Sequence, residues 1–140
     1  MTMSATDTFH AYLDAFSRSD VEAIGALYAD TTSYRNPFTE AALTNPAEVR
    51  AFEAPMFAAF SDVTATVDEA IGEGDHAAAR VTIRARHTGE LQAPGGPVPA
   101  TEKSIELACA EFIRVDAEGK IVEHHRIFDT GGFMAQLGLL

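Results

Sequence analysis

Residues 104–128 read SIELACAEFIRVDAEGKIVEHHRIF, two strand-like stretches joined by the turn Asp116-Ala-Glu-Gly119. In the first stretch apolar residues recur at every second position, which is the period of a β-strand with one buried face. A tight turn that ends in glycine then predicts a hairpin. We therefore expect antiparallel strands over residues 101–115 and 120–128.

The same alternation begins at Asp62 and runs to the turn over residues 72–75. It predicts one strand before this turn and another over residues 76–91. The connection over residues 93–100 holds three prolines and two glycines and is predicted to be a loop. Four consecutive strands with short connections indicate an antiparallel meander.

Two helices are predicted at the start of the chain and one at its end. Apolar residues at i, i+3, i+4 and i+7 predict a helix over residues 5–18. Ser19 and Glu22 form a capping-box pattern that opens a second helix. Asp129 is expected to cap a short terminal helix.

A third helix is predicted between the first two and the meander. Asn45 and Pro46 suit its N-cap and first helical position, and Pro55 is expected to kink it. Residues 31–36 form a short strand that stops at Pro37. The fold class is therefore α+β, with three helices covering one face of a curved sheet whose open end can hold a ligand pocket.

Composition supports one globular domain over residues 1–140, because 46% of the residues are hydrophobic and 22% are charged. The net charge of −11 repels phosphate backbones and anionic lipid headgroups, so nucleic acid and membrane surfaces are not expected partners. The acidic residues are unevenly distributed along the chain, because residues 1–79 contain 13 acidic and 3 basic residues. The near-neutral second half builds the predicted sheet.

The expected location is cytoplasmic. The single cysteine, Cys109, cannot form an intrachain disulfide, which suits a reducing compartment. No basic residue precedes Arg18 and no apolar stretch of signal-peptide length occurs there. No apolar run approaches the ~20 residues of a membrane span.

The inward face of the strand over residues 104–114 carries Glu111 among apolar neighbours. A symmetric turn would place Glu111 opposite His124 and on the same face as Arg126, whereas a bulge at Gly119 would place it opposite His125. The residues themselves leave both registers open. A buried carboxylate needs a partner in either case.

Several short segments resemble the SnoaL-like polyketide cyclase family of the nuclear transport factor 2-like (ketosteroid isomerase-like) superfamily. They are Tyr34-Arg-Asn-Pro-Phe38, Arg86-His-Thr-Gly89, Pro99-Ala-Thr101, Gly119-Lys-Ile-Val-Glu-His124, Asp129 and Gln136-Leu-Gly138. The resemblance implies a cone-shaped, strongly curved sheet wrapped around helices, and a homodimer formed through the outer face of the sheet. The resemblance also favours the register of the symmetric turn, in which Arg126 faces inward together with Glu111.

The resemblance implies which residues line the pocket. At some of these positions the sequence lacks the catalytic residue of the family. The acid of the cyclases falls on Arg126, and the cyclase histidine on the preceding strand falls on Glu111. In ketosteroid isomerases a helix tyrosine matches Tyr12, the aspartate base matches Asn36, and an oxyanion-hole aspartate matches Glu111. Asn36 cannot act as a carboxylate base, and the guanidinium of Arg126 stays protonated.

The leading hypothesis is a cofactor-free enzyme that performs acid/base chemistry on a small hydrophobic carbonyl compound, of the cyclase or isomerase type. Glu111 and His124 are predicted to handle the proton, Arg126 and Tyr12 to stabilise an enolate oxygen, and Asn36 to orient the substrate. The predicted substrate-binding residues besides Asn36 are Phe16, Phe60, His87, Cys109 and Phe128. No metal ligand set is expected, because the five histidines show no HxxxH or HxH spacing.

Each candidate also has a structural interpretation. If Glu111 forms a salt bridge with Arg126, we expect its pKa to be low. If it lies unpaired against Leu107 and Phe128, we expect its pKa to be raised. His124 is a surface residue in the alternative, in which case His125 takes its role. His87 can be a core histidine, Tyr12 a packed aromatic residue and Asn36 part of a turn.

The alternative function is a non-catalytic ligand-binding or accessory domain that has lost the cyclase acid. The third hypothesis is an epoxide hydrolase. It has the same weakness, because this sequence lacks the strand acid that the resemblance implies for such an enzyme. Convergence of Glu111 and Arg126 in a pocket of several hundred Å³ would leave catalysis open. A pocket filled by Phe16, Phe52 and Phe60 would favour a structural role.

Overall fold

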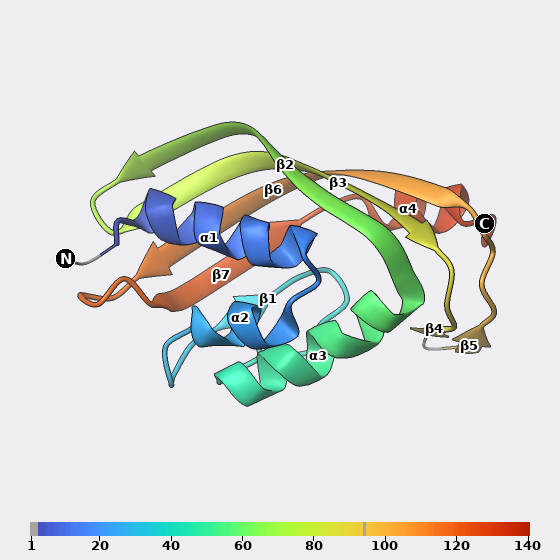
Figure 1. The fold of residues 1–140 in the computed structure, drawn as a ribbon, viewed down its shortest axis with the longest axis horizontal. Coiled ribbons are helices and arrows are strands. Elements are labelled where there is room, and N and C mark those ends of the chain that lie inside the picture. The colour runs from blue at the N-terminus through green and yellow to red at the C-terminus, as the bar shows by residue number, and fades with distance from the viewer. Residues whose placement is uncertain (1–2, 94) are drawn as a thin grey trace.

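A curved five-stranded sheet lies against helices α1, α2 and α3 in a computed structural model that describes residues 3–93 and 95–140 (Figure 1). The elements are α1 (Ala5–Ser17), α2 (Val21–Ala26), β1 (Tyr34–Arg35), α3 (Pro46–Ala59), β2 (Phe60–Glu73), β3 (His76–His87), β4 (Leu91–Ala93), β5 (Gly96–Val98), β6 (Ser104–Val115), β7 (Ile121–Ile127) and α4 (Thr130–Gln136). This architecture confirms the predicted α+β class and the three helices that cover the sheet.

The strand order of the sheet is β1-β7-β6-β3-β2. Strands β2, β3, β6 and β7 pair as the predicted antiparallel meander. The predicted strand over residues 31–36 is shorter than expected, and its two residues pair in parallel with β7, with Tyr34 beside His124. This parallel edge brings the Tyr34 side chain next to the inward face of β7.

The predicted register of the β6–β7 hairpin is wrong in both of its forms. Glu111 lies opposite Arg126, and Ile113 lies opposite His124. The pairing shifts between Arg114 and Val115, where a bulge adds a residue to β7. Relative to a symmetric turn the total shift is two residues, so every side chain keeps its face and Arg126 points inward as expected.

The start of α2 differs from the predicted capping box. Ser19 lies outside the helix with a backbone φ of 53°, and its N–H donates to the Phe16 carbonyl at the end of α1. Asp20 is the N-cap, and its carboxylate accepts from the Ala23 N–H at 3.0 Å. Helix α2 therefore begins one residue later than the pattern suggested.

The segment over residues 93–100, predicted as a loop, contains part of a short hairpin. Strands β4 and β5 pair antiparallel, with Gln92 opposite Pro97 and Ala93 opposite Gly96, which has a φ of 117°. A two-stranded hairpin consists of edges, where a proline without an N–H is tolerated. Pro94, in the same segment, lies outside the described residues.

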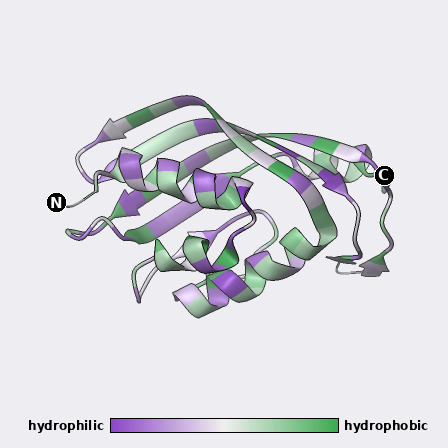
Figure 2. Ribbon diagram, in the orientation of Figure 1, coloured by the Kyte–Doolittle hydropathy of each residue, from purple (hydrophilic) through white to green (hydrophobic). Residues whose placement is uncertain are grey.

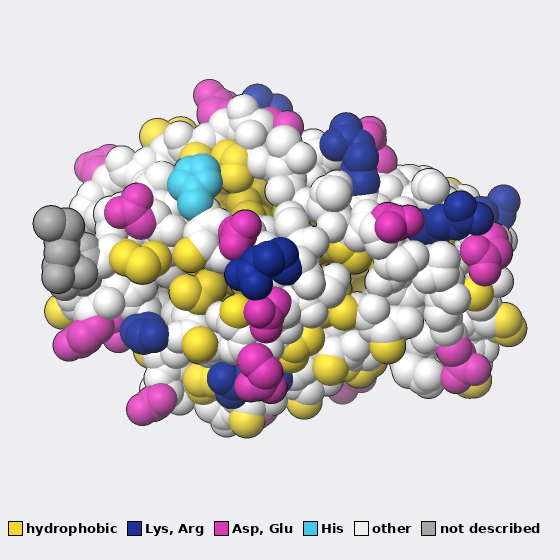
Figure 3. All heavy atoms as spheres, in the orientation of Figure 1, with side chains coloured by type: hydrophobic (Ala, Val, Ile, Leu, Met, Phe, Trp, Pro, Cys, Tyr) yellow, Lys and Arg dark blue, Asp and Glu magenta, His cyan; other side chains and the backbone are white. Residues whose placement is uncertain are grey.

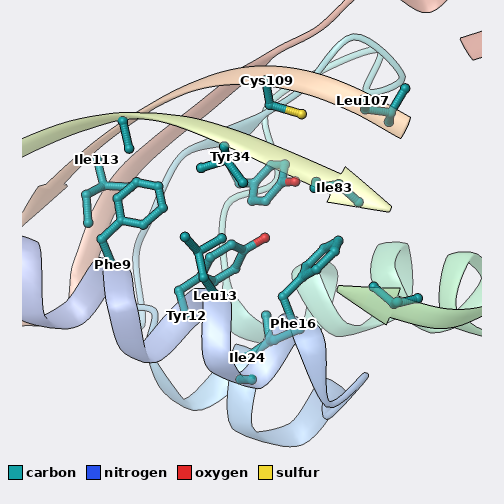
Figure 4. Close-up of a cluster of buried hydrophobic side chains, with 14 of the residues drawn as sticks. Phe9, Tyr12, Leu13, Phe16, Ile24, Tyr34, Ile83, Leu107, Cys109 and Ile113 are labelled. Atoms are coloured by element: carbon teal, nitrogen blue, oxygen red, sulfur yellow. The ribbon is translucent and has the colours of Figure 1, made fainter. Parts of the chain in front are cut away.

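Hydrophilic and hydrophobic positions alternate along the strands and helices (Figure 2), and the apolar sides meet in one core. Figure 4 shows this core between α1 and the inner face of the sheet, with side chains from α1, α2, β1, β3 and β6. Tyr12 and Tyr34 lie within it and are 1% and 0% exposed. Their hydroxyl groups point toward the end of the core where Phe16 and Ile83 lie (Figure 4).

Charged side chains are scattered over the outer surface of the helical layer, between hydrophobic and other side chains (Figure 3). Arg18 contacts Asp14 and Asp20 at 3.1 and 3.0 Å, and Arg50 contacts Glu22 at 3.2 Å. Such exposed pairs contribute at most about 1 kcal/mol each. None of the helices in the described part of the chain has the length and apolar content needed to cross a membrane.

Asn45 caps α3 as predicted, because its side-chain oxygen accepts from the Glu48 N–H at 2.9 Å. We expect Asn45→Ala to lower the free energy of unfolding by about 1 kcal/mol, measured by urea denaturation. Asn45→Ser is the matched control, since its hydroxyl oxygen restores the acceptor. Equal stability of the two variants would contradict this assignment of the cap.

Candidate functional site

A cavity of about 70 Å³ opens between α1, α3 and the inner face of the sheet. Its wall is mostly apolar and includes seven of the nine phenylalanines of the chain: Phe16, Phe38, Phe52, Phe57, Phe60, Phe128 and Phe133. Only three of the described residues in the wall carry polar side chains: Asn36, Glu53 and Arg126. An apolar cavity with a few convergent polar groups is typical of a small-molecule site.

Arg126 belongs to a buried cluster whose centre is Glu111. Glu111 Oε1 lies 3.1 Å from Arg126 Nη2 and 2.7 Å from His124 Nε2. The side chains of Glu111 and His124 are 0% exposed, and that of Arg126 is 6% exposed. The pairing of β6 with β7 produces this arrangement, because Arg126 is the direct cross-strand neighbour of Glu111 and His124 lies two residues earlier on the same face.

Two tyrosines extend this cluster. The Tyr28 hydroxyl lies 2.6 Å from His124 Nδ1, and Arg126 Nη2 donates to the Tyr12 hydroxyl at 2.9 Å. Burial lowers the pKa of His124, although the hydrogen bond and charge of Glu111 oppose that shift. A neutral imidazole satisfies all these contacts, since Nε2–H donates to Glu111 and Nδ1 accepts from Tyr28.

Glu111 is ionised in this environment. Burial by itself raises the pKa of Glu111, but the charge of Arg126 and the hydrogen bond from His124 outweigh it and lower the pKa to about 2. Burial likewise disfavours the charged guanidinium, yet Glu111 and its neighbours hold the pKa of Arg126 well above its ordinary value. The pair is a buried ion pair without net charge.

A second buried carboxyl group lies in the cavity wall on α3. Glu53 is 3% exposed, and its Oε1 accepts from the Tyr34 hydroxyl at 3.2 Å. Asn36 Nδ2 donates to the same hydroxyl at 3.1 Å, while Asn36 Oδ1 accepts from the Phe38 N–H at 2.7 Å. Burial raises the pKa of Glu53, against the charge of Arg126 and the hydrogen bond from Tyr34. The pKa values of the two buried glutamates are therefore shifted in opposite directions: that of Glu53 is raised and that of Glu111 is lowered.

The structure divides the predicted site residues into three groups. The cavity wall contains Arg126 and four of the predicted substrate-binding residues, namely Phe16, Asn36, Phe60 and Phe128. Tyr12, Glu111 and His124 do not line the cavity and contact one another through Arg126 and Glu111. His87 and Cys109 are also absent from the cavity wall.

His87 and Cys109 have structural surroundings instead. His87 Nδ1 accepts from the Thr101 N–H at 3.1 Å, and its ring lies 5.2 Å from that of Phe60. Burial raises the pKa of the Cys109 thiol to about 11, which leaves little thiolate at neutral pH. The part of the chain that the structure describes holds no cluster of three or more His, Cys, Asp or Glu side chains suited to a metal ion.

Three residues of the site escaped the sequence prediction: Glu53, Tyr28 and Tyr34. Glu53 carried a detectable signal, because Val49 and Glu53 are four residues apart and both buried on α3, on the stripe that faces the sheet. Tyr34 was quoted only as part of a motif. Tyr28 lies beyond the C-terminal end of α2, and sequence spacing carries no sign of its contact with His124.

Comparison with known proteins agrees with this fold. The family model of the SnoaL-like domain matches residues 9–124. The chain therefore belongs to the SnoaL-like domain family, as its resemblance to the SnoaL-like polyketide cyclases indicated. No curated protein matches the chain.

Solved structures of similar proteins include several polyketide cyclases. IdmH, a putative polyketide cyclase from Streptomyces antibioticus, is 29% identical, with coverage of 97% of this chain and 99% of its own and a TM-score of 0.75. A putative SnoaL-like polyketide cyclase from Jannaschia sp. CCS1 is 15% identical over 97% and 92% of the two chains, with a TM-score of 0.82. A putative polyketide cyclase from Silicibacter sp. TM1040 is 20% identical over 96% of each chain, with a TM-score of 0.80.

Removing the charge of Glu111 leaves the buried guanidinium of Arg126 without its counter-charge. We expect Glu111→Gln to lower the free energy of unfolding at pH 7 by about 3–5 kcal/mol. The pKa of Glu111 falls from an ordinary 4.5 to about 2 in the folded protein, so its contribution is present above pH 4.5 and is lost as the pH falls toward 2. The difference between wild type and variant should shrink in urea titrations from pH 7 to pH 3.

Glu106→Gln is the matched control. Glu106 lies on the exposed face of β6, the strand that carries Glu111, and pairs with Arg84 of β3 at 2.8 Å. Its loss should cost less than about 1 kcal/mol. If Glu111→Gln fails to fold, the double variant Glu111→Gln/Arg126→Gln removes both charges and should recover a folded protein. A wild-type advantage that stays constant from pH 7 to pH 3 would contradict the assignment.

Proposed function

We propose that this protein is a cofactor-free enzyme that enolises a small hydrophobic carbonyl compound, in a reaction of the polyketide cyclase or isomerase type. Its membership of the SnoaL-like domain family supports this proposal. The observation that carries it is the position of Arg126, which lines an otherwise apolar cavity while Glu111 and Tyr12 hold its guanidinium at 3.1 and 2.9 Å.

Arg126 supplies a fixed positive charge where an enolate oxygen would form. A guanidinium cannot replace the acid implied by the resemblance at this position, but it can donate hydrogen bonds to an oxyanion. Its side chain is held on two sides, and the Phe16 ring lies 5.0 Å from its Cζ. A preorganised donor in a site of low dielectric stabilises developing charge more than water does.

The remaining polar residues have complementary roles in the proposal. Glu111 and His124, predicted to handle the proton, lie behind Arg126 and serve as positioning residues for it. The Tyr12 hydroxyl accepts a hydrogen bond from the guanidinium of Arg126 and so helps to fix its orientation. Asn36 lies in the cavity wall and orients the substrate carbonyl.

The second candidate function is a small-ligand-binding domain without catalysis. Arg126 and Asn36 favour it, because they stand where the resemblance implies an acid and a carboxylate base. The cavity of about 70 Å³ is well below the several hundred Å³ that a drug-sized ligand occupies, which limits either function to a small ligand. Phe16, Phe52 and Phe60 all lie in its wall. A polyketide would enter only if some of the phenylalanine rings turned aside.

Exchange of α-protons for deuterium tests the proposed function, because enolisation is the step that cyclases and isomerases share. We expect wild-type protein to accelerate exchange in cyclohexanone or 2-tetralone, followed by proton NMR in deuterium oxide. Arg126→Lys should lower the exchange rate by about 10²–10³-fold, the effect of losing one oxyanion donor. Arg84→Lys, on the exposed face of β3, is the matched control.

The two candidate functions give different results in this experiment. A ketone that raises the melting temperature without any exchange would support the ligand-binding domain instead. Arg126→Lys keeps a positive charge beside Glu111, so its fold can be verified by circular dichroism before rates are compared. A rate unchanged by this substitution would count against the oxyanion role.

We also propose that two copies of the chain associate through the outer face of the sheet. Phe112 and Ile127 are 51% and 48% exposed there, beside the small side chain of Ala110. The pairs Arg84–Glu106 and Arg114–Glu123 flank this apolar patch at 2.8 and 2.9 Å. An apolar centre with a charged rim is typical of an interface between proteins.

Substituting a charge into this patch should separate the copies. We expect Phe112→Glu to convert a dimer into a monomer in size-exclusion chromatography with light scattering, since a carboxylate would be buried without a partner. Ala26→Glu, at an exposed position on α2 and so on the opposite side of the sheet, is the matched control and should leave the mass unchanged. A wild-type monomer at micromolar concentration would refute the interface.

A further inference from the structure

We propose that Glu53 is the catalytic residue that removes and returns the substrate α-proton. This inference rests on the proposed function and adds its missing proton acceptor. Neither the family match nor the similar structures assign a role to this position. The argument starts from the contents of the cavity wall.

Glu53 is the only acidic residue among the described residues that line the cavity. It comes from α3, while Arg126 comes from β7, so a ligand in the cavity contacts a carboxyl group and a guanidinium from different elements. Enolisation needs this pairing, because the base acts on carbon while the cation holds the oxygen. The rest of the wall, apart from Asn36, is apolar.

A hydrogen-bonded chain orients the Glu53 carboxyl group. Asn36 Nδ2 donates to the Tyr34 hydroxyl at 3.1 Å, and this hydroxyl donates to Glu53 Oε1 at 3.2 Å. The Asn36 amide is itself fixed, since its Oδ1 accepts from the Phe38 N–H at 2.7 Å. A base held by a second group that a third one orients is a recurrent arrangement at catalytic sites.

Glu111 is unsuited to the same task. Its Oε1 is engaged by both Arg126 and His124, and its side chain is fully buried outside the cavity wall. Its low pKa also makes it a weak base, whereas burial raises the pKa of Glu53 toward the neutral range in which a general base works best. The two buried glutamates thus divide the work between holding a charge and moving a proton.

The position of Glu53 also accounts for the residue that the resemblance finds missing. The strand position of the expected acid is Arg126, and the position of the expected base is Asn36. Both of these residues line the cavity together with Glu53. The helix therefore provides the carboxyl group that neither β7 nor the segment after β1 carries.

The proposed step is balanced without a cofactor. The Glu53 carboxylate takes the α-proton, the C–H electron pair becomes the C=C bond of the enolate, and the carbonyl π pair moves onto oxygen. Arg126 donates hydrogen bonds to that oxygen. In the return step the Glu53 carboxylic acid delivers a proton to carbon, and the C=O bond forms again.

The substitution Glu53→Gln tests this step, because glutamine has the same size and still accepts a hydrogen bond from Tyr34. We expect it to lower α-proton exchange of cyclohexanone or 2-tetralone by at least about 100-fold, the contribution of a general base. Binding of the same ketone, measured by the rise in melting temperature, should persist. Glu48→Gln, at a partly exposed position on the first turn of α3 and outside the cavity wall, is the matched control and should exchange as wild type does.

A pH profile separates a proton-transfer role from a structural one. The charged and titratable groups around Glu53 are Arg126, Glu111 and Tyr34, which act on it directly, and Tyr12 and Tyr28, whose own pKa values respond to it. The pKa of Glu111 lies near 2 and those of the tyrosines are raised above 10. His124 also lies close by, with its ring centroid 4.7 Å from that of Tyr34, and burial lowers its pKa, so the substitution decides which of the two groups titrates. The limb of kcat/KM that belongs to Glu53 rises with pH above the ordinary glutamate range, because burial raises the pKa of Glu53. It should disappear in Glu53→Gln and persist in Glu53→Asp at a lower rate.

The outcomes distinguish this inference from the proposed function. Wild-type exchange with an unchanged rate in Glu53→Gln overturns the role of Glu53 and leaves the enolisation proposal standing. A limb that survives in Glu53→Gln also overturns it. If wild-type protein exchanges neither ketone, both proposals fail. Should Glu53→Gln not fold, Glu53→Asp provides the same comparison, with a rate close to that of wild type as the contradicting result.

Discussion

The ion pair between Glu111 and Arg126 constrains the interior of this protein more than any other contact. Two opposite charges survive there because they lie on adjacent strands within 3.1 Å and because His124 and Tyr12 each add a hydrogen bond to the pair. Either charge alone would be costly to bury. Removal of one partner leaves the other charge buried beneath the helices, whereas removal of both does not, so the cavity depends on the two charges balancing each other.

The pair also determines how the cavity is polarised. Arg126 reaches the cavity wall while its counter-charge stays outside, so a ligand meets the guanidinium and Glu53 but not Glu111. An isolated carboxyl group beside an arginine would normally ionise readily. Here Glu111 already neutralises Arg126, which weakens that pull on Glu53 and leaves burial as the larger influence on its pKa.

Sequence periodicity was sufficient for the meander and for the inward direction of Glu111, because alternation reports the face of a strand directly. It could not report the partner of Glu111, since the turn and the bulge in β7 together shift the register by two residues, which leaves the face unchanged. Glu53 went unnoticed because a charged residue on a helix usually faces solvent, and its burial depends on Tyr34 and on the packing of α3 against the sheet. Contacts between elements distant in sequence leave no local pattern.

In the proposed function, the phenylalanine rings of the cavity wall select the substrate, whereas other residues carry out the chemistry. The rings belong to several elements, and their rotamers, rather than the backbone, limit the room available to a ligand. The polar groups come from other residues and are held by their own hydrogen bonds. Trimming one ring, such as Phe57 or Phe128, would enlarge the chamber while leaving the proton-transfer groups in place. A lineage with this layout can change the size of its substrate by single substitutions and keep the same reaction.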